Sequence, residues 1–404
     1  MPVMKISDGF YSVGVQNPNL RVFDIIMKTE FGTTYNAYLV RGSKKTALIE
    51  TVHKRFFDEH IENIQEVCDI SKIDYIILNH CEPDHSGSLA ALLKLNPDIT
   101  VVASVPGIKY LSAITNTTFN AVAAKDGDKI DLGGRELVFI TAPFLHWPDS
   151  MFTYSEADKA LFSCDFFGAH YCEPRLVDKY IKYPADYEKA FENYYKAIFS
   201  PFRSFVVAGL EKVDKLNIQT ICTSHGPILT ESIEAAKEKY RRWSAESPVK
   251  DKTALILYVS AYGCTKALAE TARDILIKAG YETEMLNIIE HDSGAIKEKI
   301  DSCSVLMLGS PTINKDALKP VWDIVSSIDA IKNKGKLCGV FGSYGWSGEG
   351  VPMLAERLRS LNLNVYGDGV RANFVPSENE LKAMSEYTEG LISSRKQRPS
   401  NFLR

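Results

Sequence analysis

The stretch NHCEPDHSGS, residues 79–88, brings two histidines, a glutamate and an aspartate together just where an apolar run ends. That run, IDYIILN, predicts a strand, and SLAALLKL after it has the periodicity of a helix. A strand-to-helix loop can turn four such side chains into one pocket, which a regular helix could not do. In the alternative interpretation an aspartate and a serine cap the helix, but capping accounts for at most two of these residues. The candidates are His80, Glu82, Asp84 and His85.

Three more candidate ligands, His146, Asp165 and His225, each follow an apolar, strand-like run. We therefore expect all of them at the same edge of a sheet as the opening motif. A lone histidine in such a place is more often a core or surface residue, but seven ligand-type residues in this pattern indicate a metal site. Four imidazoles with three carboxylates form a harder, more anionic set than an all-imidazole zinc site, which favours iron over zinc.

The bulk properties predict an ordinary cytoplasmic protein. With 404 residues, two domains are expected. The net charge is -4, and no long basic run is present, which argues against a nucleic-acid partner. The N-terminus lacks the apolar segment of a signal peptide, and no run of about 18 apolar residues predicts a membrane span. The eight cysteines form no C-x-x-C pair, which indicates reduced thiols and no built-in rubredoxin or zinc ribbon.

The chain divides into two patterns on either side of the polar segment RRWSAESPVKDKT, residues 241–253. We expect one domain at 1–248, with short strands, turns and a few helices, and a second at 249–404. The second alternates apolar strands with amphipathic helices, which predicts an α/β domain with a doubly wound parallel sheet of about 150 residues.

Three loops of this second domain have the composition of a ligand site. SAYGCTKALA, from residue 260, leads into a helix whose N-terminal amides would face a phosphate. GSPTIN (309–314) and GSYGWSGEG (342–350) follow later strands, at the carboxyl ends where open α/β sheets bind ligands. The first loop could also be an ordinary helix cap, and the aromatic residues of the third could simply pack. No G-x-G-x-x-G fingerprint indicates a tightly bound dinucleotide.

The order H-x-[HE]-x-D-H, then His, Asp and His, resembles the binuclear site of the metallo-β-lactamase fold, with Glu82 where a histidine is usual. Together with GTTYNAYLV (32–40), LHWPDSMFTY (145–154), CDFFGAH (164–170), SHG (224–226) and the three C-terminal loops, it resembles the flavodiiron proteins. This resemblance implies an N-terminal metallo-β-lactamase-like αββα sandwich followed by a flavodoxin-like domain.

The resemblance also implies the site residues. One iron would be held by His80, Glu82 and His146, the other by Asp84, His85 and His225, with Asp165 bridging. His170 and Tyr195 correspond to polar residues that the family places near the irons. The FMN site would comprise Ser260, Tyr262, Gly263, Cys264, Thr265, Pro311, Thr312, Ile313, Asn314, Ser343, Tyr344, Gly345, Trp346 and Gly348. Cys264 stands where many relatives have serine, and Tyr262 where many have tryptophan. A thiol is a poor donor to phosphate, but the backbone amides and Thr265 would still bind it, so the effect of Cys264 on FMN affinity is left open.

The activity that this resemblance implies is the reduction of dioxygen to water, of nitric oxide to nitrous oxide, or of both, as a defence in anaerobes. Electrons would reach the diiron site through FMN from an external donor: rubredoxin, an NADH-linked flavin reductase or a reduced deazaflavin. A head-to-tail homodimer, alone or paired into a tetramer, would set the FMN of one subunit beside the irons of the other. The competing hypothesis is a zinc hydrolase of the metallo-β-lactamase fold fused to a flavodoxin-like module.

Overall fold

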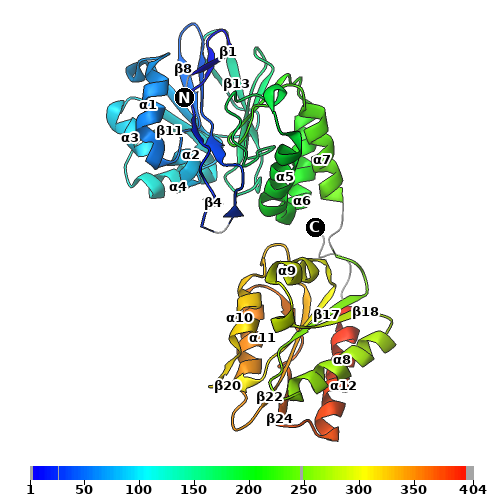
Figure 1. The fold of residues 1–404 in the computed structure, drawn as a ribbon. Helices are drawn as coiled ribbons and strands as arrows, with labels where there is room; N and C mark the ends of the chain where they lie inside the picture. Colours follow the sequence, from blue (N-terminus) through cyan, green and yellow to red (C-terminus); the bar gives the residue numbers. More distant parts are fainter. Residues whose placement is uncertain (1–2, 26, 246–248, 397–404) are drawn as a thin grey trace. The chain divides into compact units, whose positions relative to one another are not determined.

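The computed structural model describes residues 3–25, 27–245 and 249–396. The chain divides into two compact units, residues 1–245 and 246–404 (Figure 1). The predicted domain boundary, between 248 and 249, borders residues 246–248, which lie outside the described residues.

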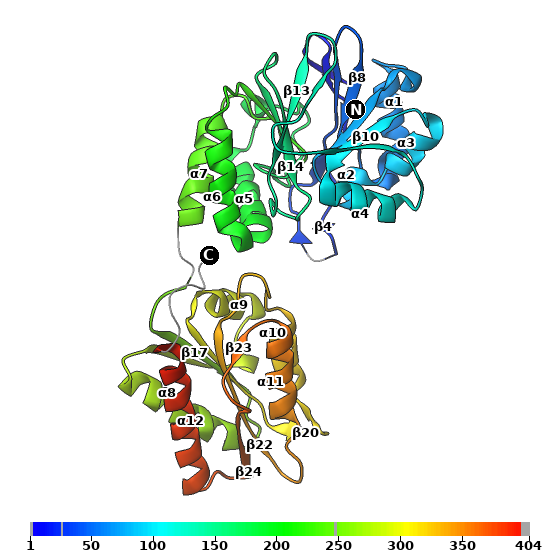
Figure 2. The ribbon, with the colours of Figure 1, turned by 180° about the vertical axis from the view of Figure 1, so that it is seen from behind.

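The first unit contains two sheets with helices on both outer sides, the αββα sandwich that the family resemblance implied (Figures 1 and 2). The seven-stranded sheet has the order β1-β2-β7-β8-β9-β10-β11 and the five-stranded sheet the order β12-β13-β14-β15-β16. The first comprises β1 (Met4–Ser7), β2 (Phe10–Ser12), β7 (Tyr38–Arg41), β8 (Thr46–Ile49), β9 (Tyr75–Leu78), β10 (Thr100–Ser104) and β11 (Asn120–Ala124). The second comprises β12 (Lys129–Asp131), β13 (Glu136–Thr141), β14 (Met151–Ser155), β15 (Ala160–Cys164) and β16 (Thr220–Thr223).

The apolar residues of the two sheets explain this layering. Phe10, Tyr38, Phe139 and Phe162 belong to a buried cluster that joins the two sheets. On the outer side of the first sheet pack helices α1 (Phe57–Gln65), α3 (Leu89–Leu95) and α4 (Val105–Thr115), and α2 (Pro83–Ser86) is a single turn before α3. On the outer side of the second sheet pack α5 (Pro184–Tyr194), α6 (Arg203–Val213) and α7 (Ile233–Ala245).

Two small antiparallel strand pairs and several short turns of helix complete this unit. The pairs are β3 (Val15–Asn17) with β6 (Thr33–Tyr35), and β4 (Val22–Phe23) with β5 (Met27–Lys28). The short helical segments are η1 (Lys54–Phe56), η2 (Ile70–Lys72), η3 (Asp178–Tyr180), the π-helix η4 (Tyr195–Phe199) and η5 (Ser200–Phe202).

Parallel strand pairing positions the metal-ligand candidates. β8, β9 and β10 run parallel in one sheet, and β15 and β16 run parallel in the other. Because the carboxyl ends of parallel strands lie at one edge, the residues that directly follow β9, β15 and β16 come together there. The helix-cap interpretation of the motif is wrong: no side chain caps α3, and the Ser86 hydroxyl donates instead to the carbonyls of Cys81 and Glu82.

The second unit is a doubly wound parallel sheet, as predicted. Its strand order is β18-β17-β19-β22-β23, with β24 also paired to β22, and all these pairs are parallel. The strands are β17 (Thr253–Tyr258), β18 (Glu282–Asn287), β19 (Val305–Gly309), β22 (Leu337–Tyr344), β23 (Asn364–Val365) and β24 (Val370–Asn373). In chain order this is the 2-1-3-4-5 arrangement of flavodoxin-like sheets.

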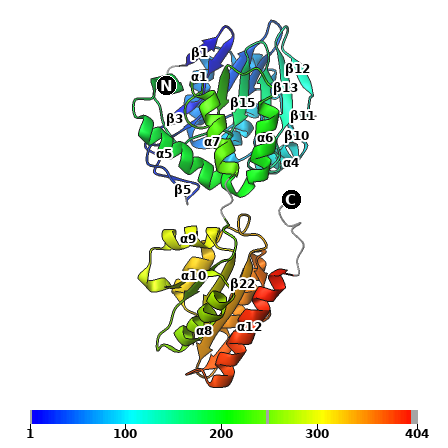
Figure 3. The ribbon, with the colours of Figure 1, turned by 90° about the vertical axis from the view of Figure 1, so that its right-hand side faces the viewer.

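Helices cover both faces of this sheet (Figure 3). Helices α8 (Cys264–Lys278) and α12 (Glu378–Lys396) pack on one face, and α9 (Ser293–Ser302), α10 (Lys319–Ser326) and α11 (Gly350–Ser360) on the other. The remaining elements are η6 (Ile288–Glu290) and the hairpin β20 (Thr312–Ile313) with β21 (Asp316–Ala317). Among the described residues, no helix is long and apolar enough to cross a membrane.

His60 of α1 gives the fold a specific sensitivity to acid. Its ring is buried, with Nδ1 2.9 Å from the carbonyl oxygen of Val13, and burial lowers its pKa from 6.5 to about 4. Below pH 6.5 the unfolded chain binds a proton that folded His60 does not, so stability falls as pH falls toward 4. Between pH 7 and 5 this linkage costs about 2 kcal/mol. We expect His60→Gln to lose that part of the pH dependence in urea denaturation, and identical dependence in both proteins would contradict the assignment.

Candidate dinuclear metal centre and flavin loops

All seven predicted ligand residues meet at the carboxyl edge of the strands described above. They come from the segment after β9, from the β13–β14 loop, and from the residues after β15 and β16. Five of them are buried, and the side chains of His146 and Glu82 are only 14% and 15% exposed. The seven are His80, Glu82, Asp84, His85, His146, Asp165 and His225.

The first group of side chains surrounds Glu82. Its Oε2 lies 3.2 Å from Nε2 of His80 and 3.4 Å from Nε2 of His146. Oδ2 of Asp165 faces the same two nitrogens, at 3.9 Å and 3.6 Å. Two imidazoles and two carboxylates therefore converge on one small volume.

The second group surrounds Asp84. Its Oδ2 lies 3.0 Å from Nε2 of His225 and 3.4 Å from Nε2 of His85. Oδ1 of Asp165 faces these nitrogens at 3.5 Å and 3.4 Å. One carboxylate oxygen of Asp165 thus serves each group, which is the arrangement that a residue bridging two ions requires.

The hydrogen-bond partners of the Nδ1 atoms, which face away from the two groups, test whether these histidines suit metal ions. Nδ1 of His225 lies 2.7 Å from the carbonyl oxygen of Thr34, which can only accept a hydrogen bond, so Nδ1 carries a proton and the neutral ring has its lone pair on Nε2. That lone pair faces Asp84, whose carboxylate oxygens are buried without a hydrogen-bond partner in the described residues. Two acceptors in contact need a cation between them, so the site fits a metal ion.

The first group is arranged in the same way. Nδ1 of His80 lies 3.1 Å from Oδ2 of Asp149, which also accepts the backbone N–H of Cys81 at 2.8 Å. Sequence analysis did not single out Asp149, although it lies in the LHWPDSMFTY motif. An imidazole held by a carboxylate on one nitrogen is a common way of orienting the other toward a metal.

Without ions, the histidines and carboxylates of the cluster compensate one another. Burial lowers the pKa of His80, but hydrogen bonds to Asp149 and Glu82 outweigh burial and raise this pKa to about 10. Burial raises the pKa of Asp165, but the charges of His85 and His146 outweigh it and hold this pKa well below its usual range. Metal binding therefore replaces protons on the imidazoles, so that affinity rises with pH.

The two polar residues predicted near the metals differ in position. His170 lies beside the second group, with its ring centroid 5.3 Å from that of His225 and its Nδ1 2.9 Å from the Thr33 hydroxyl. The hydroxyl of Tyr195 lies 2.8 Å from that of Ser244, and a place for Tyr195 near the metals stays a prediction. Its neighbour Tyr194 instead donates to Oδ1 of Asp165 at 2.7 Å. Tyr194 is the last residue of α5, and the π-helix η4 begins at Tyr195.

We expect Tyr194→Phe to lower turnover about tenfold, because a buried carboxylate loses a hydrogen bond worth about 1.5 kcal/mol. Steady-state consumption of the oxidant measures this. Tyr195→Phe is the matched control, since it removes a hydroxyl of the same helix that contacts Ser244 instead. Equal effects of the two variants would contradict the assignment.

The three flavin loops follow β17, β19 and β22, next to the switch point between the first and third strands of the sheet. Gly263 precedes α8 with φ of +82°, a conformation that favours glycine, and its Cβ position is open. The Thr265 hydroxyl is buried 2.8 Å from that of Ser343, which ties the first loop to the third. Ser260 Oγ accepts the Lys266 backbone N–H at 3.2 Å.

The other predicted flavin residues belong to all three loops. The Thr312 hydroxyl accepts the backbone N–H of Gly350 at 3.2 Å, which links the second loop to the third. Tyr262 and Trp346 are 93% and 83% exposed, so neither serves as a core residue. The remaining predicted positions are buried or half-buried at Cys264, Pro311, Tyr344, Gly345 and Gly348, and exposed at Ile313 and Asn314.

A carboxylate-bridged pair of metal positions in an αββα sandwich, joined to a flavodoxin-like sheet, defines a metal- and flavin-dependent oxidoreductase. Residues 33–226 match the ODP family beta lactamase model, and residues 256–387 match the flavodoxin model. The chain is 53% identical over 400 residues to the flavo-diiron protein FprA2 of Clostridium acetobutylicum, covering 98% of this chain and 100% of that one. The chain belongs to the flavo-diiron protein family, whose cofactors are FMN and a non-haem diiron centre.

Other relatives agree over nearly their full lengths. The nitric oxide reductase of Moorella thermoacetica is 36% identical, with 94% of this chain and 96% of that one covered. Among solved structures, rubredoxin oxygen:oxidoreductase from the anaerobe Desulfovibrio gigas aligns with a TM-score of 0.69 at 28% identity, over 98% of both chains. The flavodiiron protein from Giardia intestinalis aligns with a TM-score of 0.67 at 27% identity, over 99% of both chains.

Proposed function

We propose that this flavo-diiron protein reduces dioxygen to water, nitric oxide to nitrous oxide, or both. The observation that carries the proposal is the divided carboxylate of Asp165, whose Oδ2 faces His80 and His146 while Oδ1 faces His85 and His225. Two bound irons would supply redox and Lewis-acid chemistry for a small oxidant, and bound FMN would supply the electrons. The names of the Moorella and Desulfovibrio relatives support both substrates.

The proposed ligand assignment follows the two groups. His80, Glu82 and His146 would hold one iron, and Asp84, His85 and His225 the other, with Asp165 between them. Asp149 and the Thr34 carbonyl would keep the Nε2 atoms of His80 and His225 free of protons. Tyr194 would orient Asp165, and His170 would provide a buried imidazole beside the second iron.

The test of this activity is consumption of each gas by the chemically reduced protein, followed with oxygen and nitric oxide electrodes. We expect rapid consumption of at least one gas, with water or nitrous oxide as the product. Hydrolysis of thioesters or lactams by a zinc-loaded protein, without consumption of either gas, would contradict the proposal.

The proposed flavin site comprises the three loops, with the phosphate at the N-terminus of α8 near Ser260, Gly263 and Thr265. Cys264 is the first residue of this helix, so the backbone N–H of Cys264 is available to a phosphate whatever the thiol contributes. Titration of the flavin-free protein with FMN tests this assignment and gives the affinity that the cysteine permits.

We propose further that the active form is a head-to-tail homodimer, alone or paired into a tetramer. Tyr262 and Trp346 are exposed on the flavin loops, where a partner subunit would cover them in this arrangement. Mixing a flavin-free variant with a variant that lacks the bridging carboxylate tests this. Activity should return in the mixture, where the flavin of one chain serves the intact diiron site of the other. A mixture as inactive as its components would contradict the head-to-tail arrangement.

The electron donor is proposed to be a separate molecule, and the name of the Desulfovibrio relative supports rubredoxin. An NADH-linked flavin reductase and a reduced deazaflavin are the other donors to compare. Stopped-flow reduction of the protein by each donor identifies the fastest. The eight free cysteines support a reducing, cytoplasmic location.

A further inference from the structure

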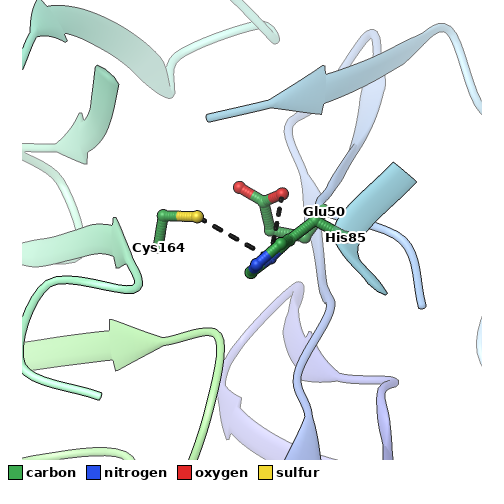
Figure 4. A group of neighbouring side chains, drawn as sticks. All are labelled: Glu50, His85 and Cys164. Carbon is green, nitrogen blue, oxygen red and sulfur yellow. Dashed lines mark hydrogen bonds and ion pairs between the residues drawn. The ribbon is translucent and has the colours of Figure 1, made fainter. Parts of the chain in front are cut away.

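Nδ1 of His85, the ring nitrogen that faces away from the second metal position, lies in a buried cluster. The members of this cluster are Glu50, His85 and Cys164 (Figure 4). Nδ1 is 3.9 Å from Oε2 of Glu50 and 3.7 Å from Sγ of Cys164. Glu50 directly follows β8 of the seven-stranded sheet, and Cys164 ends β15 of the five-stranded sheet. The ring of His85 is therefore held between groups from both sheets.

Only one of the two carboxylate oxygens of Glu50 has a hydrogen-bond partner among the described residues. Oε1 accepts the backbone N–H of Asn79 at 2.9 Å, which fixes the orientation of the carboxylate. Oε2 is buried and has no hydrogen-bond partner among the described residues. Because a buried carboxylate oxygen normally accepts a hydrogen bond, Oε2 needs a donor, and the ring nitrogen of His85 faces it. A small ring movement or one bridging water would complete the contact.

The backbone on both sides of the ring adopts a conformation that is costly for residues other than glycine. Glu50 has φ of +61° and Cys164 has φ of +53°. Such conformations cost about 1–3 kcal/mol each and persist where the surrounding structure requires them, often at functional sites. Here they bring two side chains from different sheets onto the same imidazole.

We propose that Glu50 is the positioning residue for His85. It accepts the Nδ1–H of the ring, so that Nε2 presents its lone pair to the second metal position. This inference rests on the proposed ligand set, in which His80 and His225 have acceptors of this kind, Asp149 and the Thr34 carbonyl. Glu50 gives His85 the corresponding acceptor.

Glu50→Gln tests the proposal because Asn79 fixes the orientation of the new amide. The amide oxygen must accept the Asn79 N–H, so the NH₂ group takes the position of Oε2 and points a donor at Nδ1 of His85. The ring then carries its proton on Nε2, where it cannot bind a metal ion. The variant should weaken binding at the second position and leave the first unchanged.

The experiment titrates the metal-free full-length chain with Co²⁺ at pH 8 and follows both the d–d absorption and the number of bound ions. We expect the wild type to bind two Co²⁺, and Glu50→Gln to bind the second about 10- to 100-fold more weakly. The thermal unfolding temperature of the metal-free protein serves as the measure of general damage. Glu173→Gln is the matched control, because Glu173 is also a buried glutamate of this unit, with its carboxylate bonded to Arg175.

Cys164→Ala distinguishes the role of Glu50 from that of the thiol. It also keeps the proposal testable if Glu50→Gln does not fold. It should retain both ions, because Glu50 remains as acceptor. The proposal is overturned if Cys164→Ala loses the second ion, if Glu50→Gln binds both ions normally or weakens both equally, or if the wild type binds a third Co²⁺ with a thiolate charge-transfer band. A wild type that binds fewer than two Co²⁺ would instead contradict the proposed ligand set itself.

Discussion

Replacing Asp165 by asparagine is expected to lower turnover of dioxygen or nitric oxide by about 10³-fold. The side chain keeps its shape but loses the negative charge that faces four histidine nitrogens, two through each oxygen. Bridging carboxylates offset the charge of two divalent ions and hold both within reach of one small substrate. The expected loss corresponds to several kcal/mol of transition-state stabilisation, because each factor of ten in rate equals about 1.4 kcal/mol. Steady-state gas consumption measures the loss.

The control for this variant is Asp158→Asn, which neutralises another aspartate of the same sandwich, one whose side chain is only 5% exposed. Asp158 pairs with Arg135 at 3.0 Å and is not among the seven ligands, so its loss should change stability and leave turnover per folded, metal-loaded chain unchanged. A merely structural role for Asp165 would give the same pattern, lower stability with turnover retained, and that outcome would contradict the bridging assignment.

The second large effect is expected from Gly263→Val, which should weaken FMN binding roughly 10²-fold. The glycine has φ of +82° directly before α8, and the space around its Cβ position is open. A valine there projects into the proposed phosphate position and strains the turn that presents the helix amides. Contacts to a phosphate at such a site are worth about 2–3 kcal/mol. Fluorescence titration of the flavin-free protein with FMN gives the affinity directly.

Gly280→Val provides a matched control for this change. Gly280 also has φ of +82° and an open Cβ position, but it lies just after the other end of α8. Both variants should therefore lose similar stability, while only Gly263→Val should lose FMN. Iron content should stay normal in both, because the ligands lie in the other unit. Equal FMN affinity of the two variants would exclude the proposed phosphate position.

Much of the fold was predictable because the local patterns agree with the final packing. Alternating apolar strands and amphipathic helices predicted the parallel sheet after Thr253, and the segment around His80 predicted a strand, a ligand loop and a helix. The seven ligand candidates were found because each follows a strand, and parallel strands deliver such residues to one edge. The structure brings all seven together.

The outer contacts of the site could not be predicted in the same way. Glu50, Asp149 and the Thr34 carbonyl act through pairings between segments far apart in the sequence, and nothing in their local patterns indicates a partner. The hydrogen bond from Tyr194 to Asp165 likewise joins two segments that the local sequence pattern does not connect. These features appear only when the two sheets are packed together.

The most direct test of the account is the metal and flavin content of protein purified without oxygen from iron-supplied cells. Plasma mass spectrometry counts the metals, and the absorbance spectrum with released flavin counts FMN. The account predicts about two irons and one FMN per chain, the stoichiometry of one dinuclear centre and one flavodoxin-like site. Zinc in place of iron, with flavin well below one per chain, would contradict it and favour a hydrolase.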